Sequence, residues 1–264
     1  MCLEDCSDCL SAGDVHCFSD CSAQELQWLF QVGCQLCEGN GYDMSQISVC
    51  AGSAPSEPFI AEIAEGSSNN KYIEIFNPTG AAISLDGYYF GSVSNSPATP
   101  GQYDHYNPFN TGATVGSGDV YVVCHGSADA AILAECDEPS WTYLSNGDDA
   151  YCLLKGDTTT YDAIDCVGDF QGDPGSGWPV CGVAAATQDK TLVRKADADF
   201  SAATAAGVGV TNPTQAIWTY TSVTDCQWDI YDQNTWTYLG SHTVTGAGAA
   251  VGCVGSVYGG GLSH

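Results

Sequence analysis

Cysteine is the residue type with the clearest chemistry in this sequence, since 15 of the 264 residues are cysteines. Disulfides form and persist in oxidising compartments, whereas cytosolic proteins rarely carry them. The cysteine content therefore predicts a secreted, extracellular protein. Met1 is not followed by a basic segment and an apolar one, so no signal peptide is visible. We expect that it has been removed from this numbering or lies upstream of it.

Eight cysteines fall within the first 50 residues, and many of them are three or four positions apart. This spacing places thiols on one face of a helix, so we expect a small disulfide-rich α-helical module whose disulfides replace a hydrophobic core. Zinc binding is the alternative, because two Cys-x2-Cys pairs have ligand-like spacing. Disulfides are favoured, because the intervening spacings fit no single zinc ribbon well. The eight residues are Cys2, Cys6, Cys9, Cys17, Cys21, Cys34, Cys37 and Cys50.

The other seven cysteines suggest three further disulfides. One would close a loop, one would join the arms of a hairpin, and one would tie the C-terminal tail to the domain. The candidate pairs are Cys124 with Cys136, Cys152 with Cys166, and Cys226 with Cys253. Cys181 is then the odd cysteine, which either bridges two chains or remains free.

No catalytic constellation is evident in the sequence. It lacks a His-Glu-x-x-His motif, a Gly-x-Ser-x-Gly motif and a phosphate-binding glycine loop with lysine. The five histidines are scattered along the chain. We therefore predict no catalytic residues and a protein that is not an enzyme.

Acidic loops make calcium the one candidate cofactor. Asp148, Asp149, Asp169 and Asp173 place carboxylate oxygens on expected loops, and oxygen is the ligand that calcium prefers. These residues do not follow the EF-hand spacing. The alternative is that they are exposed acids in turns, as expected in so acidic a protein.

Two pairs of aromatic residues suggest a glycan-binding strip. Trp218 with Tyr220, and Trp236 with Tyr238, are each two positions apart. Residues at this spacing share one face of a strand, and exposed rings there would stack on sugars. The alternative is that these rings lie in a buried sandwich face or contact the N-terminal module.

The charge balance excludes several classes of function. Five Lys and Arg residues stand against 32 Asp and Glu residues, which gives a net charge of −27. Such a polyanion repels nucleic-acid phosphates and anionic lipid headgroups. No apolar run approaches the roughly 18 residues of a membrane span. We therefore expect neither nucleic-acid binding nor membrane insertion.

From Pro58 onward, short β-forming runs alternate with Gly, Asn, Asp and Pro, which is typical of an antiparallel sandwich or barrel. The expected strands are 59–64, 72–76, 119–124, 150–154, 161–167, 191–194, 217–220 and 236–239, with a short helix within 128–135.

Two expectations concern side chains within these strands. Alternation predicts that Ile73 and Ile75 face one side of the sheet and Glu74 the other. Arg194, in an expected strand, should pair with a carboxylate.

The sequence divides into four expected parts. They are a helical module at 1–50, a linker at 51–57, a β-sandwich at 58–244 and a Gly-rich tail at 245–264.

The β region resembles the lamin-tail domain family over about residues 59–243. The phrases that carry the resemblance, in order along the chain, are Ile60–Ile63, Tyr72–Pro78, Ile83–Tyr89, Gly118–Val123, Asn146–Ala150 with Leu153–Gly156, Asp162–Asp165, Lys190–Lys195 and Trp236–His242. The resemblance implies an immunoglobulin-like antiparallel β-sandwich. It also implies a binding and structural module that is not itself catalytic.

Together these features favour an extracellular structural protein that assembles into a fibre or surface layer. Its terminal segments would dock head to tail on the β-sandwich of the next copy, so other copies of the chain are its expected partners. The alternative is a secreted adhesion or carbohydrate-binding module, assisted by calcium, with a glycan as its partner.

Overall fold

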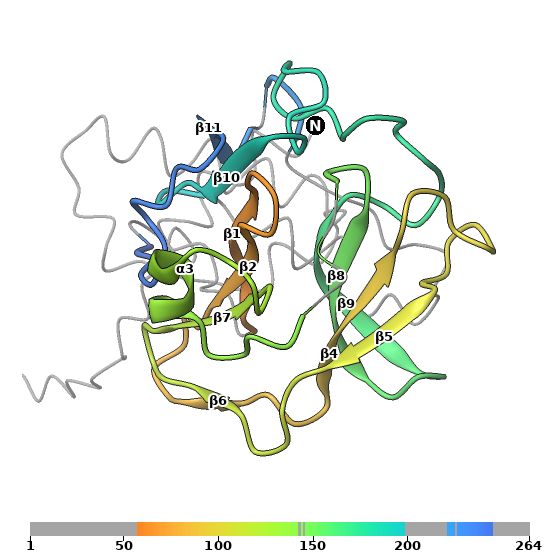
Figure 1. Ribbon diagram of the computed structural model, residues 1–264. Helices are drawn as coiled ribbons and strands as arrows, with labels where there is room; N and C mark the ends of the chain where they lie inside the picture. The colour runs from red at the N-terminus through yellow and green to blue at the C-terminus, as the bar shows by residue number, and fades with distance from the viewer. Residues whose placement is uncertain (1–56, 142–143, 145, 199–220, 225, 245–264) are drawn as a thin grey trace, which may run out of the picture. The chain divides into compact units, whose positions relative to one another are not determined.

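A computed structural model describes residues 57–141, 144, 146–198, 221–224 and 226–244, all within the unit Ser53–His264 (Figure 1). The expected helical module at 1–50 and the tail at 245–264 lie outside the described residues. Within the described ranges, no helix is long and apolar enough to cross a membrane. The fold is mainly β, and all its strand pairs are antiparallel.

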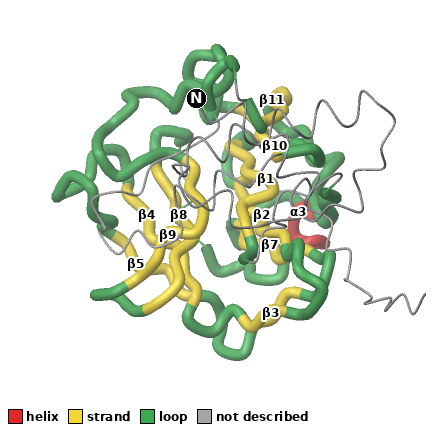
Figure 2. The backbone as a smooth tube through the Cα atoms, turned by 180° about the vertical axis from the view of Figure 1, so that it is seen from behind, coloured by secondary structure: helices red, strands yellow, loops and turns green. Residues whose placement is uncertain are grey.

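The larger sheet has five strands in the order β11-β10-β1-β2-β7 (Figures 1 and 2). It brings together segments from both ends of the described chain, since β11 and β10 pair beside β1. The strands are β1 (Phe59–Glu65), β2 (Lys71–Phe76), β7 (Val120–Cys124), β10 (Lys190–Arg194) and β11 (Trp228–Asp232).

The second sheet has four strands in the order β5-β4-β8-β9, and a two-stranded sheet pairs β3 with β6. The expected hairpin around residues 150–167 is confirmed, because β8 pairs with β9. The strands are β3 (Ile83–Ser84), β4 (Tyr88–Val93), β5 (His105–Pro108), β6 (Thr114–Val115), β8 (Ala150–Gly156) and β9 (Tyr161–Val167).

The hydrophobic core lies between the two large sheets. Ile73 and Ile75 of β2 belong to one buried cluster with Phe90 of β4 and Leu153 of β8. Glu74, between the two isoleucines, points to the outer face of the five-stranded sheet, as the alternation predicted. A sandwich of two antiparallel sheets is therefore confirmed.

Two local elements differ from the expectation or refine it. The expected short helix is α3 (Ala130–Glu135), and Asp129 caps it by accepting a hydrogen bond from the Ala131 amide. The expected strand at 236–239 is wrong, because the strand is β11, which ends at Asp232. A turn follows in which Asn234 has φ of 64° and the Thr235 amide donates to the Asp232 carbonyl. The expected strand at 217–220 lies outside the described residues.

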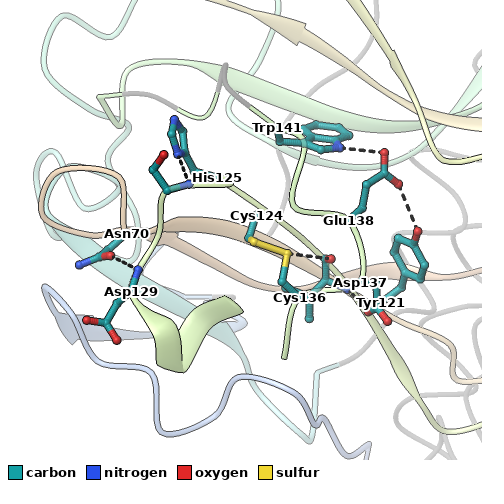
Figure 3. Close-up of a disulfide and its surroundings, with 11 residues drawn as sticks. Asn70, Tyr121, Cys124, His125, Asp129, Cys136, Asp137, Glu138 and Trp141 are labelled. Atoms are coloured by element: carbon teal, nitrogen blue, oxygen red, sulfur yellow. Dashed lines mark hydrogen bonds between the residues drawn. A yellow bond between two sulfur atoms is a disulfide. The ribbon is translucent and has the colours of Figure 1, made fainter. Parts of the chain in front are cut away.

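Three disulfides join described residues. Cys124–Cys136 and Cys152–Cys166 are the pairs that the sequence predicted, and Figure 3 shows the first of them beside α3. Cys181 is not the odd cysteine, because it pairs with Cys226. The Cys181 amide donates to the Thr221 carbonyl, which brings the loop after β9 against the segment before β11. The predicted Cys226–Cys253 pair is therefore wrong, and Cys253 itself lies outside the described residues.

Candidate binding site beside strand β11

Residues 236–243, which we call the strap, cross the outer face of the five-stranded sheet after the turn that follows β11. Trp236 and Leu239 pack on a cluster that includes Tyr72 and Ile132 of α3. Further along, the ring of His242 stands edge-on to Phe76, with 5.1 Å between ring centroids. The strap therefore covers side chains from β1, β2 and β7 that would otherwise face solvent. In Figure 1 it runs beside α3.

A cleft of about 290 Å³ lies between the strap and strands β10 and β11. One wall carries an aromatic pair, Tyr231 of β11 and Tyr238 of the strap, whose ring centroids are 4.8 Å apart at 34°. Tyr238 is 39% exposed. The hydrogen bond with Tyr238, followed by burial, raises the pKa of Tyr231 to about 12. Polar groups on the walls come from Asp229, Thr237, Ser241 and Thr243.

Two buried carboxyl groups lie beneath the strap. Glu62 of β1 and Glu74 of β2 are directly opposite each other in the antiparallel pair, with exposures of 1% and 0%. The Tyr72 hydroxyl donates to Glu62 Oε1. The Gly240 amide of the strap donates to Glu74 Oε2 at 2.7 Å. Glu74 is therefore a direct link between the sheet and the strap.

Burial shifts the protonation of both carboxyl groups. It raises the pKa of Glu62 to about 7, against the opposing effect of the Tyr72 hydrogen bond. It raises the pKa of Glu74 to about 8, and the negative charge of Glu62 adds to this effect while the Gly240 amide opposes it. Burial, followed by the charge of Arg194, lowers the pKa of His242 to about 4. Near pH 7, His242 is therefore neutral, Glu74 is mostly protonated and Glu62 is about half protonated.

The family model described as Lamin Tail Domain matches residues 51–168. Residues 51–168 are therefore similar to the lamin tail domain family. This match confirms the resemblance inferred from the sequence for β1 to β9. The lamin tail match ends before β10, β11 and the strap, although β10 pairs with β1 in the same sheet.

A crystal structure of a DUF4876 family protein from Bacteroides thetaiotaomicron VPI-5482 is also similar. It is 14% identical, covers 71% of this chain and 74% of that chain, and superposes with a TM-score of 0.39. No curated protein matches the chain.

The structure does not bring the four expected calcium ligands together as a metal-binding group. Asp149 is buried, and its carboxylate accepts hydrogen bonds from the Asn95 amide and the Tyr151 hydroxyl. Asp169 and Asp173 each accept a bond from an amide two residues further along their own loop. Asp148 does not complete a metal site with these residues. The described part of the chain has no group of three or more His, Cys, Asp or Glu side chains that could hold a metal.

The expected aromatic strip is replaced by a different pair. Trp236 and Tyr238 do not lie in a strand, so they do not share a strand face. Trp236 packs inward, whereas Tyr238 stacks on Tyr231, a residue that the sequence did not single out. A turn signal was available in the intervening Asp232–Thr235 stretch, whose side chains favour turns. Trp218 and Tyr220 lie outside the described residues.

Proposed function

We propose that this protein is an extracellular, non-catalytic binding module whose cleft beside β11 binds a carbohydrate. Three disulfides within the described β region support the extracellular location, because such bonds persist in oxidising compartments. The lamin tail match supports a β-sandwich that serves as a rigid scaffold. The strand side of a site built on such a scaffold is held in a fixed geometry.

The paired rings of Tyr231 and Tyr238 are the observation that carries the proposal. A sugar ring presents an apolar C–H face and several hydroxyl groups, so its binding site needs an aromatic surface together with hydrogen-bonding groups. The cleft offers both, since the tyrosine wall stands beside Asp229, Ser241 and Thr243. Carboxylate and hydroxyl oxygens accept hydrogen bonds, and the hydroxyls also donate them.

A glycan array followed by titration calorimetry tests the proposal. The wild-type protein should bind at least one oligosaccharide class, and Tyr238→Ala should weaken that binding by about tenfold, or about 1.4 kcal/mol. Tyr106→Ala is the matched control, because Tyr106 is also exposed, at 48%, but lies on β5 of the other sheet. Loss of binding in both variants, or in neither, contradicts a site at this cleft.

A second candidate is head-to-tail assembly into a fibre or surface layer, as the sequence favoured. The observation in its favour is that β11 is an edge of the five-stranded sheet among the described strands, and pairs with β10 on one side. An edge strand accepts a further strand from another chain. We propose that residues 1–50 or 245–264 of a second copy supply this contact.

Electron microscopy should then show filaments, and deletion of residues 245–264 should abolish them if the tail supplies the contact. A stable monomer by light scattering at high concentration contradicts assembly.

A further inference from the structure

The strap lies over an unusual arrangement of two carboxyl groups. Glu62 and Glu74 face each other across neighbouring antiparallel strands. Opposed residues in such a pair have Cβ atoms about 4.5–5.5 Å apart, and like charges at this distance destabilise the pair. Both side chains are almost completely buried, so water does not screen their repulsion.

No base compensates the pair within the described chain. The titratable groups that interact with it are a tyrosine on β2, two acids on and after α3, and a tyrosine on β11. His242 is neutral at pH 7, and the guanidinium of Arg194 pairs with Asp165. The groups that interact with the pair are Tyr72, Glu135, Asp137 and Tyr231.

The hydrogen bonds of the pair also indicate a bound proton. Glu62 accepts from Tyr72 with one oxygen, and Glu74 accepts from the Gly240 amide with one oxygen. The other oxygens, Glu62 Oε2 and Glu74 Oε1, are buried and have no hydrogen-bond partner among the described residues. A buried carboxylate oxygen without a donor is costly, whereas a protonated carboxyl removes that charge and supplies a donor of its own.

We infer that protons bound by Glu62 and Glu74 hold the strap against the sheet, and that ionisation of both carboxyl groups releases the strap and dismantles the cleft. Glu62 and Glu74 are thus positioning residues for the proposed binding site. The part of this inference that concerns the ligand rests on the proposed function. The part that concerns the strap stands on the geometry alone.

The sign of the pH dependence follows from proton linkage. With the strap released, solvent reaches both carboxyl groups and their pKa returns towards the ordinary value near 4.5, whereas in the docked state it is about 7 for Glu62 and about 8 for Glu74. The docked state therefore binds more protons, and docking weakens as pH rises towards 8. His242 has the opposite sign, because docking lowers its pKa from 6.5 to about 4. Released His242 is about half protonated at pH 6.5, so it partly offsets the glutamates there and contributes little above about pH 7.5.

Hydrogen exchange measured on the full chain by mass spectrometry tests the inference. After correction for intrinsic rates, the protection of residues 236–243 should fall at least tenfold between pH 6.5 and 8. In the Glu62→Gln/Glu74→Gln variant it should change less than twofold. Asp86→Asn is the matched control, because Asp86 is an exposed acid between β3 and β4, outside the five-stranded sheet, and it should keep the wild-type pH dependence. Peptides from β4 and β8 report whether each variant is folded.

Two outcomes overturn the inference: protection of the strap that does not change with pH in the wild type, or an equal change in the double glutamine variant. If the double variant does not fold, Glu74→Gln alone decides in the same way, with about a third of the logarithmic change expected, because only the Glu62 contribution remains. Carbohydrate titration over the same pH range separates this inference from the proposed function. If the protection of the strap depends on pH but no glycan binds, only the proposed function is contradicted. If a glycan binds and neither its affinity nor the protection of the strap depends on pH, only the inference about the strap is contradicted.

Discussion

Arg194 of β10 and Asp165 of β9 form an ion pair that joins the two sheets of the sandwich. Arg194 Nη2 lies 2.5 Å from Asp165 Oδ2, and the side chain of the arginine is 1% exposed. The guanidinium also lies 4.0 Å from the ring centroid of Trp228 on β11. The same Asp165 oxygen accepts a hydrogen bond from the Ile60 amide of β1. This contact attaches β10 and β11 to the segment that matches the lamin tail family.

Removal of the carboxylate charge from this pair should strongly destabilise the protein. In Asp165→Asn the guanidinium remains buried without its counter-ion, and breaking a buried pair in this way costs about 3–5 kcal/mol. Urea unfolding should show this loss. Lys190→Met is the control, because its partner Asp232 is 94% exposed, and exposed pairs contribute little. A similar effect of the two substitutions would mean that Arg194 is not effectively buried.

Peptide mapping under non-reducing conditions should recover Cys181 linked to Cys226. The two cysteines of this disulfide are 45 positions apart, whereas Cys124 and Cys136 are 12 apart. Loop-closure entropy predicts stabilisation of about 4 kcal/mol for the longer loop and about 3 kcal/mol for the shorter. Thermal unfolding of the two double serine variants should follow that order. A Cys226–Cys253 peptide in the map contradicts the pairing.

Local sequence patterns predicted much of the sandwich. Ile73 and Ile75 alternate with Glu74, and this period of two fixes the face of β2. The cysteines at 152 and 166 flank a hairpin whose arms must be neighbours. The pairing of Arg194 with a carboxylate also followed from its place in an expected strand, because a charge buried in a strand needs a partner.

The site was harder to predict because it depends on contacts between distant segments. Glu74 and Gly240 are 166 positions apart and meet through one hydrogen bond, which no local pattern reports. The 236–239 segment has the composition of a strand, yet packing of Trp236 beside α3 determines its conformation. Tertiary contacts override local propensity in such segments.

The conformation of Gly240 should be essential for the strap. Gly240 has φ of 89°, and a Cβ atom there would lie 2.4 Å from Glu135 Oε2. A side chain in this left-handed conformation costs about 1–2 kcal/mol, so Gly240→Ala should lower the hydrogen-exchange protection of residues 236–243 by about tenfold. Gly112→Ala is the control, since Gly112 has φ of 78° with no atom within 4 Å of an added Cβ. Equal loss of strap protection in both variants contradicts a local role for Gly240.

A calcium chelator should leave the melting temperature unchanged. No group that could hold a metal is formed by the expected ligands Asp148, Asp149, Asp169 and Asp173. The Asp149 carboxylate instead accepts hydrogen bonds from the Asn95 amide and the Tyr151 hydroxyl. Differential scanning calorimetry with EDTA and with added calcium checks this. A rise in melting temperature with calcium that Asp149→Asn abolishes would restore the calcium site.

The free energy of unfolding should fall as pH rises from 6.5 to 8. Glu62 and Glu74 have folded-state pKa values of about 7 and about 8, above the ordinary value of 4.5. The folded state therefore holds protons that the unfolded chain has released, and each still-protonated carboxyl lowers stability by about 1.4 kcal/mol per pH unit. Stability gained from these protons is complete below about pH 4.5 and is lost as pH rises through about 7 and about 8, so the dependence levels off only above about pH 9. Urea unfolding should show that the free energy of unfolding falls with pH in the wild type but not in the Glu62→Gln/Glu74→Gln variant. If it falls equally in the variant, the protons belong to other groups.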